Sequence, residues 1–150
     1  MSFKMPALFL VCLAAALPRV VSAHPAPFSY LDLLIRDEAI DGILVLHVVD
    51  VAHELNISPP ELLLEPNAEA RYRDRIVGLI DPRITLSTGR VLPIEWLGME
   101  PAPERHGVVV RFRIPVVRPG ALSVLTRMFP YDPIHQTFVN VYEDAKLRQQ

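Results

Sequence analysis

The sequence predicts a mainly β fold: an Ig-like antiparallel β-sandwich of about seven strands with a helical insertion at roughly residues 50–81. Three observations predict it. Short runs that alternate apolar and polar residues recur along the chain, turn-forming residues separate these runs, and one proline-rich interval replaces the alternation with helical spacing. The 150 residues, of which 51% are hydrophobic and 21% charged, are enough for one globular domain.

The first 23 residues have the pattern of a signal peptide. Lys4 precedes an apolar run over residues 5–17, Pro18 ends the run, and small residues up to Ala23 suit a signal peptidase. The run is shorter than the roughly 20 residues of a spanning helix. We therefore expect a mature extracytoplasmic domain over residues 24–150, periplasmic or at the cell surface, with no membrane span and without the chain's one cysteine.

The first strands of that domain are predicted from alternation and β-branched residues. Residues 28–35 alternate, with Leu31, Leu33 and Ile35 on one face. A polar stretch then leads into the β-branched run 43–49, which predicts a hairpin. Its turn is at either Asp37-Glu38 or Asp41-Gly42.

The insertion is marked by Pro59, Pro60 and Pro66, each at a position where a helix can begin without losing a needed N–H group. Asn67 is a plausible N-cap. The helix that follows is predicted to end before Pro82, and its apolar face consists of Ala68, Tyr72, Ile76, Leu79 and Ile80. A second helix in the insertion is an open alternative.

The chain then returns to strands. The clearest is 108–114, where Arg111 and Arg113 alternate with apolar residues, as in a half-buried strand. Proline-rich sequence precedes it, and Thr88-Gly89 predicts a turn between two earlier strands. The further strands are predicted at 83–87, 91–97, 122–129 and 137–142.

Charge and motifs exclude several function classes. The 15 Lys and Arg residues are balanced by 17 Asp and Glu residues, which gives a net charge of −2 and little support for a nucleic-acid partner. The sequence has no GxSxG, glycine-rich phosphate loop, HExxH or CxxC motif. These observations favour a non-catalytic function.

The five histidines are the best candidate transition-metal ligands. After cleavage His24 would carry both a free α-amine and an imidazole Nδ1, and a second imidazole would complete an all-nitrogen site that suits Cu(II). Pro25 has no N–H group to deprotonate, which leaves only this amine-plus-imidazole mode. The alternative is that His24 is merely the residue left by processing.

His135 is the candidate for the second imidazole. It follows Asp132-Pro133, a pair that favours a turn. Asp132 would then orient the His135 ring as a second-shell carboxylate. The alternative is a histidine that only closes the turn. We expect no ligand role for the other histidines: His47 is expected to pack in a strand, His53 to lie on a polar face, and His106 at a solvated strand end.

The segment 129–144, FPYDPIHQTFVNVYED, is rich in aromatic residues and has no Lys or Arg. Its four aromatic residues are a candidate recognition surface or part of the core. Alternation places Phe138 and Tyr142 on one face of a strand and Val139 and Val141 on the other, so at least one aromatic set is expected to be buried.

This segment, with His24-Pro25 and Ser29-Tyr30-Leu31, resembles the extracytoplasmic N-terminal region of HupE/UreJ-like membrane proteins, which are related to hydrogenase and urease accessory permeases. The resemblance covers residues 24–150. It implies a β-rich domain beside a permease-type membrane partner, either a separate protein or a membrane half beyond residue 150. It also adds nickel to copper as a candidate metal, and it implies no catalytic residues.

The favoured function is therefore an exported, non-catalytic binding or accessory domain that docks to a permease-type partner or presents Cu or Ni to it through His24 and His135. Two alternatives stay open. One is a copper-dependent oxidoreductase built on the same two histidines, which needs an open coordination position and a substrate surface. The other is a purely structural ectodomain that binds only protein.

Overall fold

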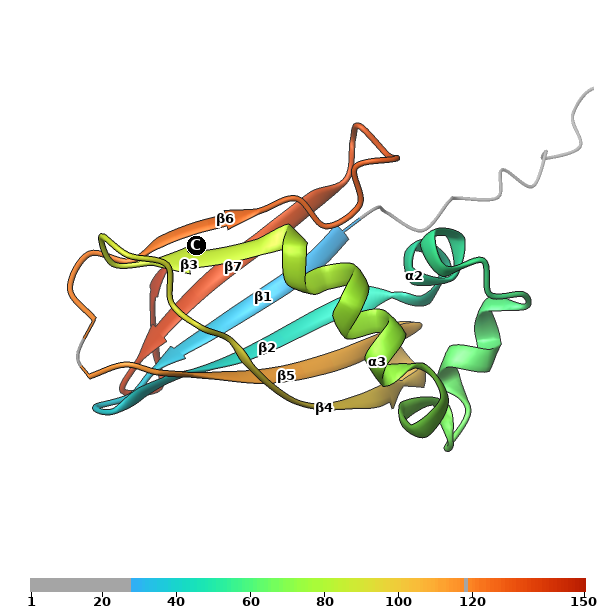
Figure 1. Cartoon of the computed structure of the whole chain (residues 1–150), viewed down its shortest axis with the longest axis horizontal. Helices are drawn as coiled ribbons and strands as arrows, with labels where there is room; N and C mark the ends of the chain where they lie inside the picture. Colours follow the sequence, from blue (N-terminus) through green and yellow to red (C-terminus); the bar gives the residue numbers. More distant parts are fainter. Residues whose placement is uncertain (1–27, 118) are drawn as a thin grey trace, which may run out of the picture.

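A computed structural model describes residues 28–117 and 119–150 and is mainly β, as predicted (Figure 1). The predicted signal peptide and His24 lie outside the described residues. The strands are β1 (Phe28–Ile35), β2 (Ala39–His47), β3 (Ile84–Ser87), β4 (Glu95–Ala102), β5 (Gly107–Pro115), β6 (Ser123–Thr126), β7 (Gln136–Glu143) and β8 (Lys146–Gln149).

The predicted helical insertion is present. It contains two α-helices, α2 (Val48–Leu55) and α3 (Ala68–Ile80), together with the 3-10 helices η1 (Pro60–Leu64) and η2 (Asp81–Arg83). A third 3-10 helix, η3 (Pro103–Arg105), precedes β5. The buried face of α3 consists of Ala68, Tyr72, Ile76 and Ile80, as the helical spacing predicted, and α3 packs against β4.

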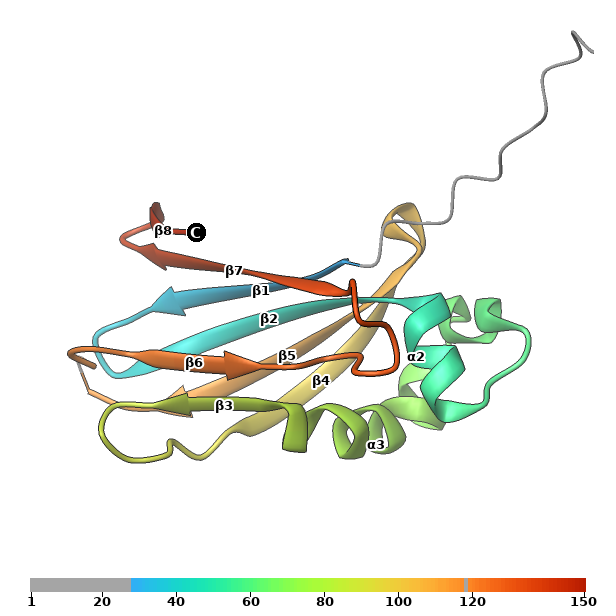
Figure 2. The same ribbon diagram turned by 90° about the horizontal axis from the view of Figure 1, so that it is seen from above.

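The strands form two sheets in a sandwich-like arrangement. The larger sheet has the strand order β4-β5-β2-β1-β7-β8, and β3 pairs with β6 in a smaller sheet. Figure 2 shows α3 and β3 in line with each other along one side of the larger sheet. The main apolar core includes Leu31, Leu33, Leu44, Leu46, Leu86, Val110, Phe112 and Ile114.

One pairing departs from the predicted all-antiparallel sandwich. β1 pairs antiparallel with β2 but parallel with β7. The parallel pair arises because β6 belongs to the smaller sheet, so the chain crosses between the sheets after Thr126 and enters β7 in the direction of β1.

The first hairpin turns at the earlier of its two predicted positions. The turn lies between β1 and β2, and the Arg36 N–H group donates to the Ala39 carbonyl at 2.8 Å. Asp41 and Gly42, the other candidate turn, lie inside β2. Gly42 is opposite Phe112 of β5, and a Cβ atom at Gly42 would overlap the Phe112 ring.

The strand predicted at 91–97 is shifted towards the C-terminus. β4 begins at Glu95 and continues through Pro101, while Val91 forms only an isolated bridge with Ser87. Pro101 is tolerated because β4 is an edge strand, where one side needs no ladder hydrogen bonds. The alternation predicted for 108–114 is confirmed in β5, with Arg111 and Arg113 exposed.

Candidate functional site

The aromatic residues of segment 129–144 divide between core and surface. Phe129 is buried, and Tyr131 is 41% exposed. In β7, Val139 and Val141 pack against the core, whereas Phe138 is on the other face, where its ring stacks on Tyr30 at 5.6 Å between centroids. Phe129 is thus buried, but Phe138 and Tyr142, the set that shares one face of β7, are only half-buried, so the expectation that a whole aromatic set would be buried is wrong.

His135 ends a loop of consecutive turns, as the sequence predicted. The Asp132 N–H group donates to the Phe129 carbonyl, and the His135 N–H group donates to the Asp132 carbonyl, each at 3.2 Å. The Asp132 carboxylate accepts the Ile134 N–H group at 3.0 Å. Asp132 thus closes the turn through its own side chain, as short polar residues often do.

The His135 ring lies between two residues distant in sequence. Its Nε2 is 2.9 Å from Ser29 Oγ in β1, and its Nδ1 is 3.8 Å from Asp50 Oδ2 in α2. The ring also contacts Phe129 edge to face. Only 3% of the His135 side chain is exposed, and Nδ1 is buried without a hydrogen bond. The carboxylate that faces the ring is therefore that of Asp50, where the sequence predicted Asp132.

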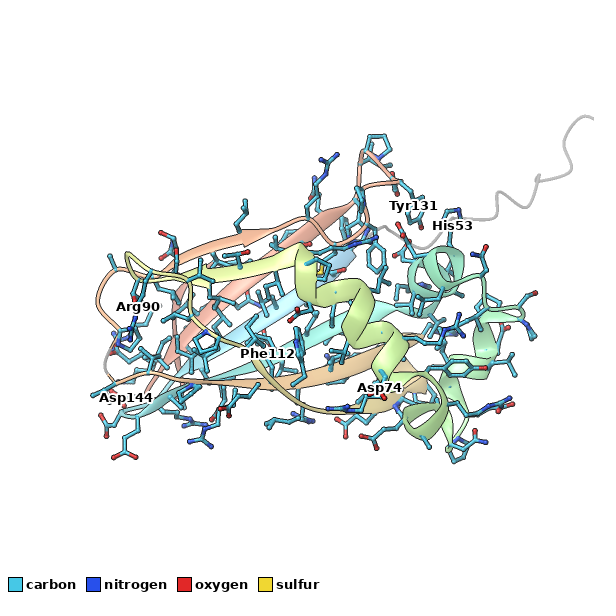
Figure 3. The ribbon with its side chains drawn as sticks, in the orientation of Figure 1. His53, Asp74, Arg90, Phe112, Tyr131 and Asp144 are labelled. Carbon is cyan, nitrogen blue, oxygen red and sulfur yellow. The ribbon has the colours of Figure 1, made fainter. Side chains whose placement is uncertain are left out.

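Asp50 joins α2 to this loop. Its Oδ1 accepts a hydrogen bond from the Tyr131 hydroxyl at 2.5 Å. Burial and this hydrogen bond to the carboxylate raise the pKa of Tyr131. The Tyr131 ring also stacks on His53, with centroids 4.0 Å apart (Figure 3). Asp50 is 6% exposed, so the contact is made largely out of water.

A second contact joins the same two segments. Arg83 pairs with Glu54 of α2 at 2.8 Å, and it donates to the Met128 carbonyl beside Phe129. Both charged side chains are less than one-fifth exposed. We call the group Ser29, Asp50, Tyr131 and His135 the histidine cluster. Its contacts fix the loop between β6 and β7 against α2 and β1.

The order Asp50, His135, Ser29 has the connectivity of a hydrolase triad but not its geometry. In such a triad the serine oxygen meets a substrate carbonyl, and the carboxylate is hydrogen-bonded to the ring. Here Ser29 is 0% exposed, and the Asp50–His135 separation of 3.8 Å exceeds hydrogen-bond range. The arrangement positions the loop and gives no substrate access to the hydroxyl.

Of the two proposed metal ligands, the structure describes only His135. His24 lies outside the described residues. Of the His135 nitrogens, Nε2 contacts Ser29, so only Nδ1 is without a partner. Within residues 28–117 and 119–150, no three His, Cys, Asp or Glu side chains are grouped as metal ligands would be. A metal site shared by His24 and His135 stays a prediction.

The remaining histidines lie in separate places. His47 caps the start of α2 by accepting the Val49 N–H group, His53 is exposed beside Tyr131, and His106 is exposed at the end of η3.

Sequence reasoning missed Asp50 and Ser29 as partners of His135. Ser29 did leave a signal, because alternation puts it on the same face as the core residue Leu31.

Burial lowers the pKa of His135, and Asp50 only partly opposes this effect. Burial also lowers the pKa of His47. An unfolded histidine binds a proton near its ordinary pKa of about 6.5, whereas these folded residues bind it only at lower pH. The free energy of unfolding is therefore expected to fall as pH decreases below about 6.5, by at most about 1.4 kcal/mol per pH unit for each group. Urea unfolding at pH 7.5, 6.5 and 5.5 measures this decrease in the free energy of unfolding. His135→Gln should reduce the slope of the free energy of unfolding against pH. Equal slopes for wild type and variant would contradict the assignment of this pH dependence to His135.

A cleft of about 740 Å³ opens between β6 and β7. Its apolar lining consists of side chains that pack against the main core, with Leu122 and Val124 on the β6 side and Val139 and Val141 on the β7 side. Within the described residues, these partly buried core side chains are thus accessible from this side. The remaining lining residues are Ile35, Pro119, Gly120, Ala121, Thr137, Phe138, Glu143, Arg148, Gln149 and Gln150.

The cleft is close to neutral. Among the side chains that line it, only those of Glu143 and Arg148 carry charge, and they pair with each other at 3.2 Å. Thr137, Gln149 and Gln150 add uncharged hydrogen-bonding groups. A lining that combines apolar side chains with uncharged polar groups is found at many binding sites.

No protein-family model matches the chain, and no curated protein matches it. Within the part of the chain that the structure describes, none of the helices has the length and apolar character needed to cross a membrane.

Proposed function

We propose that this chain is an exported, non-catalytic binding domain that holds an apolar partner or ligand in the cleft between β6 and β7. The observation that carries this proposal is the cleft itself, in which core side chains of both sheets remain accessible. Such an opening exposes apolar surface that a binding partner would bury. The histidine cluster supports the proposal because it fixes the loop that leads from β6 to β7.

The sequence supports the cellular setting of this function. The pattern of residues 1–23 supports export, and the resemblance of segment 129–144 to HupE/UreJ-like ectodomains supports a permease-type membrane partner. Segment 129–144 includes Val139, Val141 and Glu143, which line the cleft. The residues that carry the resemblance therefore include residues of the proposed binding site.

A neutral apolar dye, Nile red, tests whether the cleft binds apolar groups. Val124→Asp places a carboxylate in the cleft, and we expect it to weaken dye binding at least fivefold because a charge must be desolvated there. Leu125→Asp is the matched control. Leu125 is the next residue of β6, is 72% exposed and does not line the cleft, so its replacement should leave binding nearly unchanged. Fluorescence titration measures both variants.

Unfolding curves of the two variants separate loss of binding from loss of fold. If Val124→Asp does not fold, Val124→Thr preserves the shape of the side chain and replaces one methyl group with a hydroxyl, with a smaller loss of binding expected. Equal dye binding by wild type and the folded cleft variants would refute the proposed function.

A further inference from the structure

The smaller sheet has an unfilled edge. β6 pairs with β3 from Ile84↔Thr126 to Ser87↔Ser123, and no other described strand pairs with it. In an antiparallel pair, alternate residues direct their backbone groups to the partner and the others direct them away. β6 therefore keeps N–H and C=O groups on its second edge, and an edge of this kind is a template for another strand.

The side chains that line the cleft beside that edge are partly buried side chains of the core. Ile35, Val139 and Val141 belong to the larger sheet and line the cleft, while Val124 of β6 lines it from the smaller sheet. A strand placed next to β6 would lie above these side chains. Every second residue of that strand would point into the cleft, because successive side chains of a strand alternate between its faces.

The larger sheet does not fill this space. β8 pairs with β7 only from Val141 to Glu143, and all residues of β8 are exposed. The cleft extends from Thr137 at one end of β7 to Glu143 at the other, so an extended segment would follow the length of β7.

The charges in the cleft select the kind of segment. Because Glu143 and Arg148 neutralise each other, a charged side chain entering the cleft would lose water without gaining a free counter-charge. An uncharged segment with apolar residues at alternate positions has no such cost. Thr137, Gln149 and Gln150 provide hydrogen-bonding groups for its polar backbone.

We infer that the cleft accepts an extended, uncharged segment of a partner protein, which pairs with the free edge of β6 as a third strand of the smaller sheet. This inference rests on the proposed function and names the class of ligand. Backbone hydrogen bonds to β6 supply affinity, and the alternate side chains above Val139 and Val141 supply specificity. An inserted strand of about four to six residues matches the length of an ordinary strand.

Synthetic hexapeptides with capped ends test this inference. One peptide alternates Val and Thr. Two further peptides have the same sequence with N-methyl groups on the amides of alternate residues. One of them blocks the N–H groups on one edge of the bound strand, and the other blocks those on the opposite edge. We expect the first peptide to bind and to slow amide hydrogen exchange in Ser123–Thr126. One N-methylated version should bind at least tenfold more weakly, because it cannot donate to β6. Val124→Asp should abolish binding and Leu125→Asp should not.

Each other outcome counts against the inference. If Nile red binds but the peptide does not, or if both N-methylated versions bind as well as the parent peptide, the cleft binds apolar groups without strand pairing and the inference fails while the proposed function stands. If neither dye nor peptide binds, both fail. If sedimentation shows a dimer that Val124→Asp dissociates, the occupant is a second copy of this chain, and the partner-protein inference is overturned.

Discussion

Replacing Gly42 with valine is expected to lower the free energy of unfolding by about 3 kcal/mol. Gly42 lies in β2 directly opposite Phe112, and the Phe112 ring occupies the space that a Cβ atom would need. Phe112 is 1% exposed and lies edge to face against Trp96, so its ring is enclosed by neighbouring side chains. Interiors packed to this density respond to added methyl groups with strain rather than with small adjustments. Urea unfolding followed by the fluorescence of Trp96, the one tryptophan, measures the change.

Gly78 provides the matched control. It lies in α3, and a Cβ atom there would meet nothing within 4 Å. Gly78→Ala should therefore raise stability by about 0.5–1 kcal/mol, because alanine has the higher helix propensity and glycine loses more conformational entropy on folding. A Gly42→Val variant within about 1 kcal/mol of wild type would show that the Phe112 ring can move, contrary to the packing described above.

The elements predicted most closely from the sequence are those in which local pattern and burial agree. β1 buries Ser29, Leu31 and Leu33 on one face, and β5 alternates buried and exposed residues from Val110 to Pro115, so this alternation is visible in the residues themselves. The spacing of apolar residues in α3 has the same origin, since only one side of the helix faces the core. In these three elements the buried face is the face that the geometry of a strand or helix repeats at regular intervals, so the spacing of apolar residues in the sequence shows it.

The elements that the sequence predicted poorly depend on information outside the local pattern. β8 follows a turn in which Asp144 and Ala145 both have positive φ, and alanine gives no signal for that conformation. β4 contains Pro101, which is acceptable only because β4 lies at an edge. The parallel pairing of β1 with β7 depends on which sheet receives β6, and alternation along one strand does not specify its neighbours.

The histidine cluster has the same limit. The turn before His135 is local, and Asp132-Pro133 predicted it. Ser29 is 106 residues away from His135, and Asp50 comes from a helix that begins where β2 ends. A nearby carboxylate was the natural prediction for orienting the ring, yet Asp132 already accepts the Ile134 N–H group. Which carboxylate faces the ring is decided by the packing of α2 against the loop.

Asp50→Ala is expected to lower the free energy of unfolding by about 3 kcal/mol, because it removes the buried carboxylate that accepts the hydrogen bond of the Tyr131 hydroxyl. The Tyr131 hydroxyl would lose its partner, and the His135 ring would lose the carboxylate that faces Nδ1. Since Asp50 raises the pKa of His135 against the effect of burial, its removal should lower that pKa further. Urea unfolding measures the first effect, and an NMR titration of the His135 ring measures the second.

A double-mutant cycle with Tyr131→Phe distinguishes this contact from a general loss of packing. Tyr131→Phe keeps the ring that stacks on His53 and removes only the hydroxyl, so it should cost about 1–2 kcal/mol. If the hydrogen bond to Asp50 carries the effect, the double variant should be more stable than the sum of the two single changes predicts, by about 1 kcal/mol or more. Strict additivity, or an Asp50→Ala cost below about 1 kcal/mol, would mean that the loop is held against α2 mainly by the Glu54–Arg83 pair and the packing of Phe129. The loop between β6 and β7 would then not depend on the histidine cluster, and the support that the cluster gives to the proposed binding function would be withdrawn.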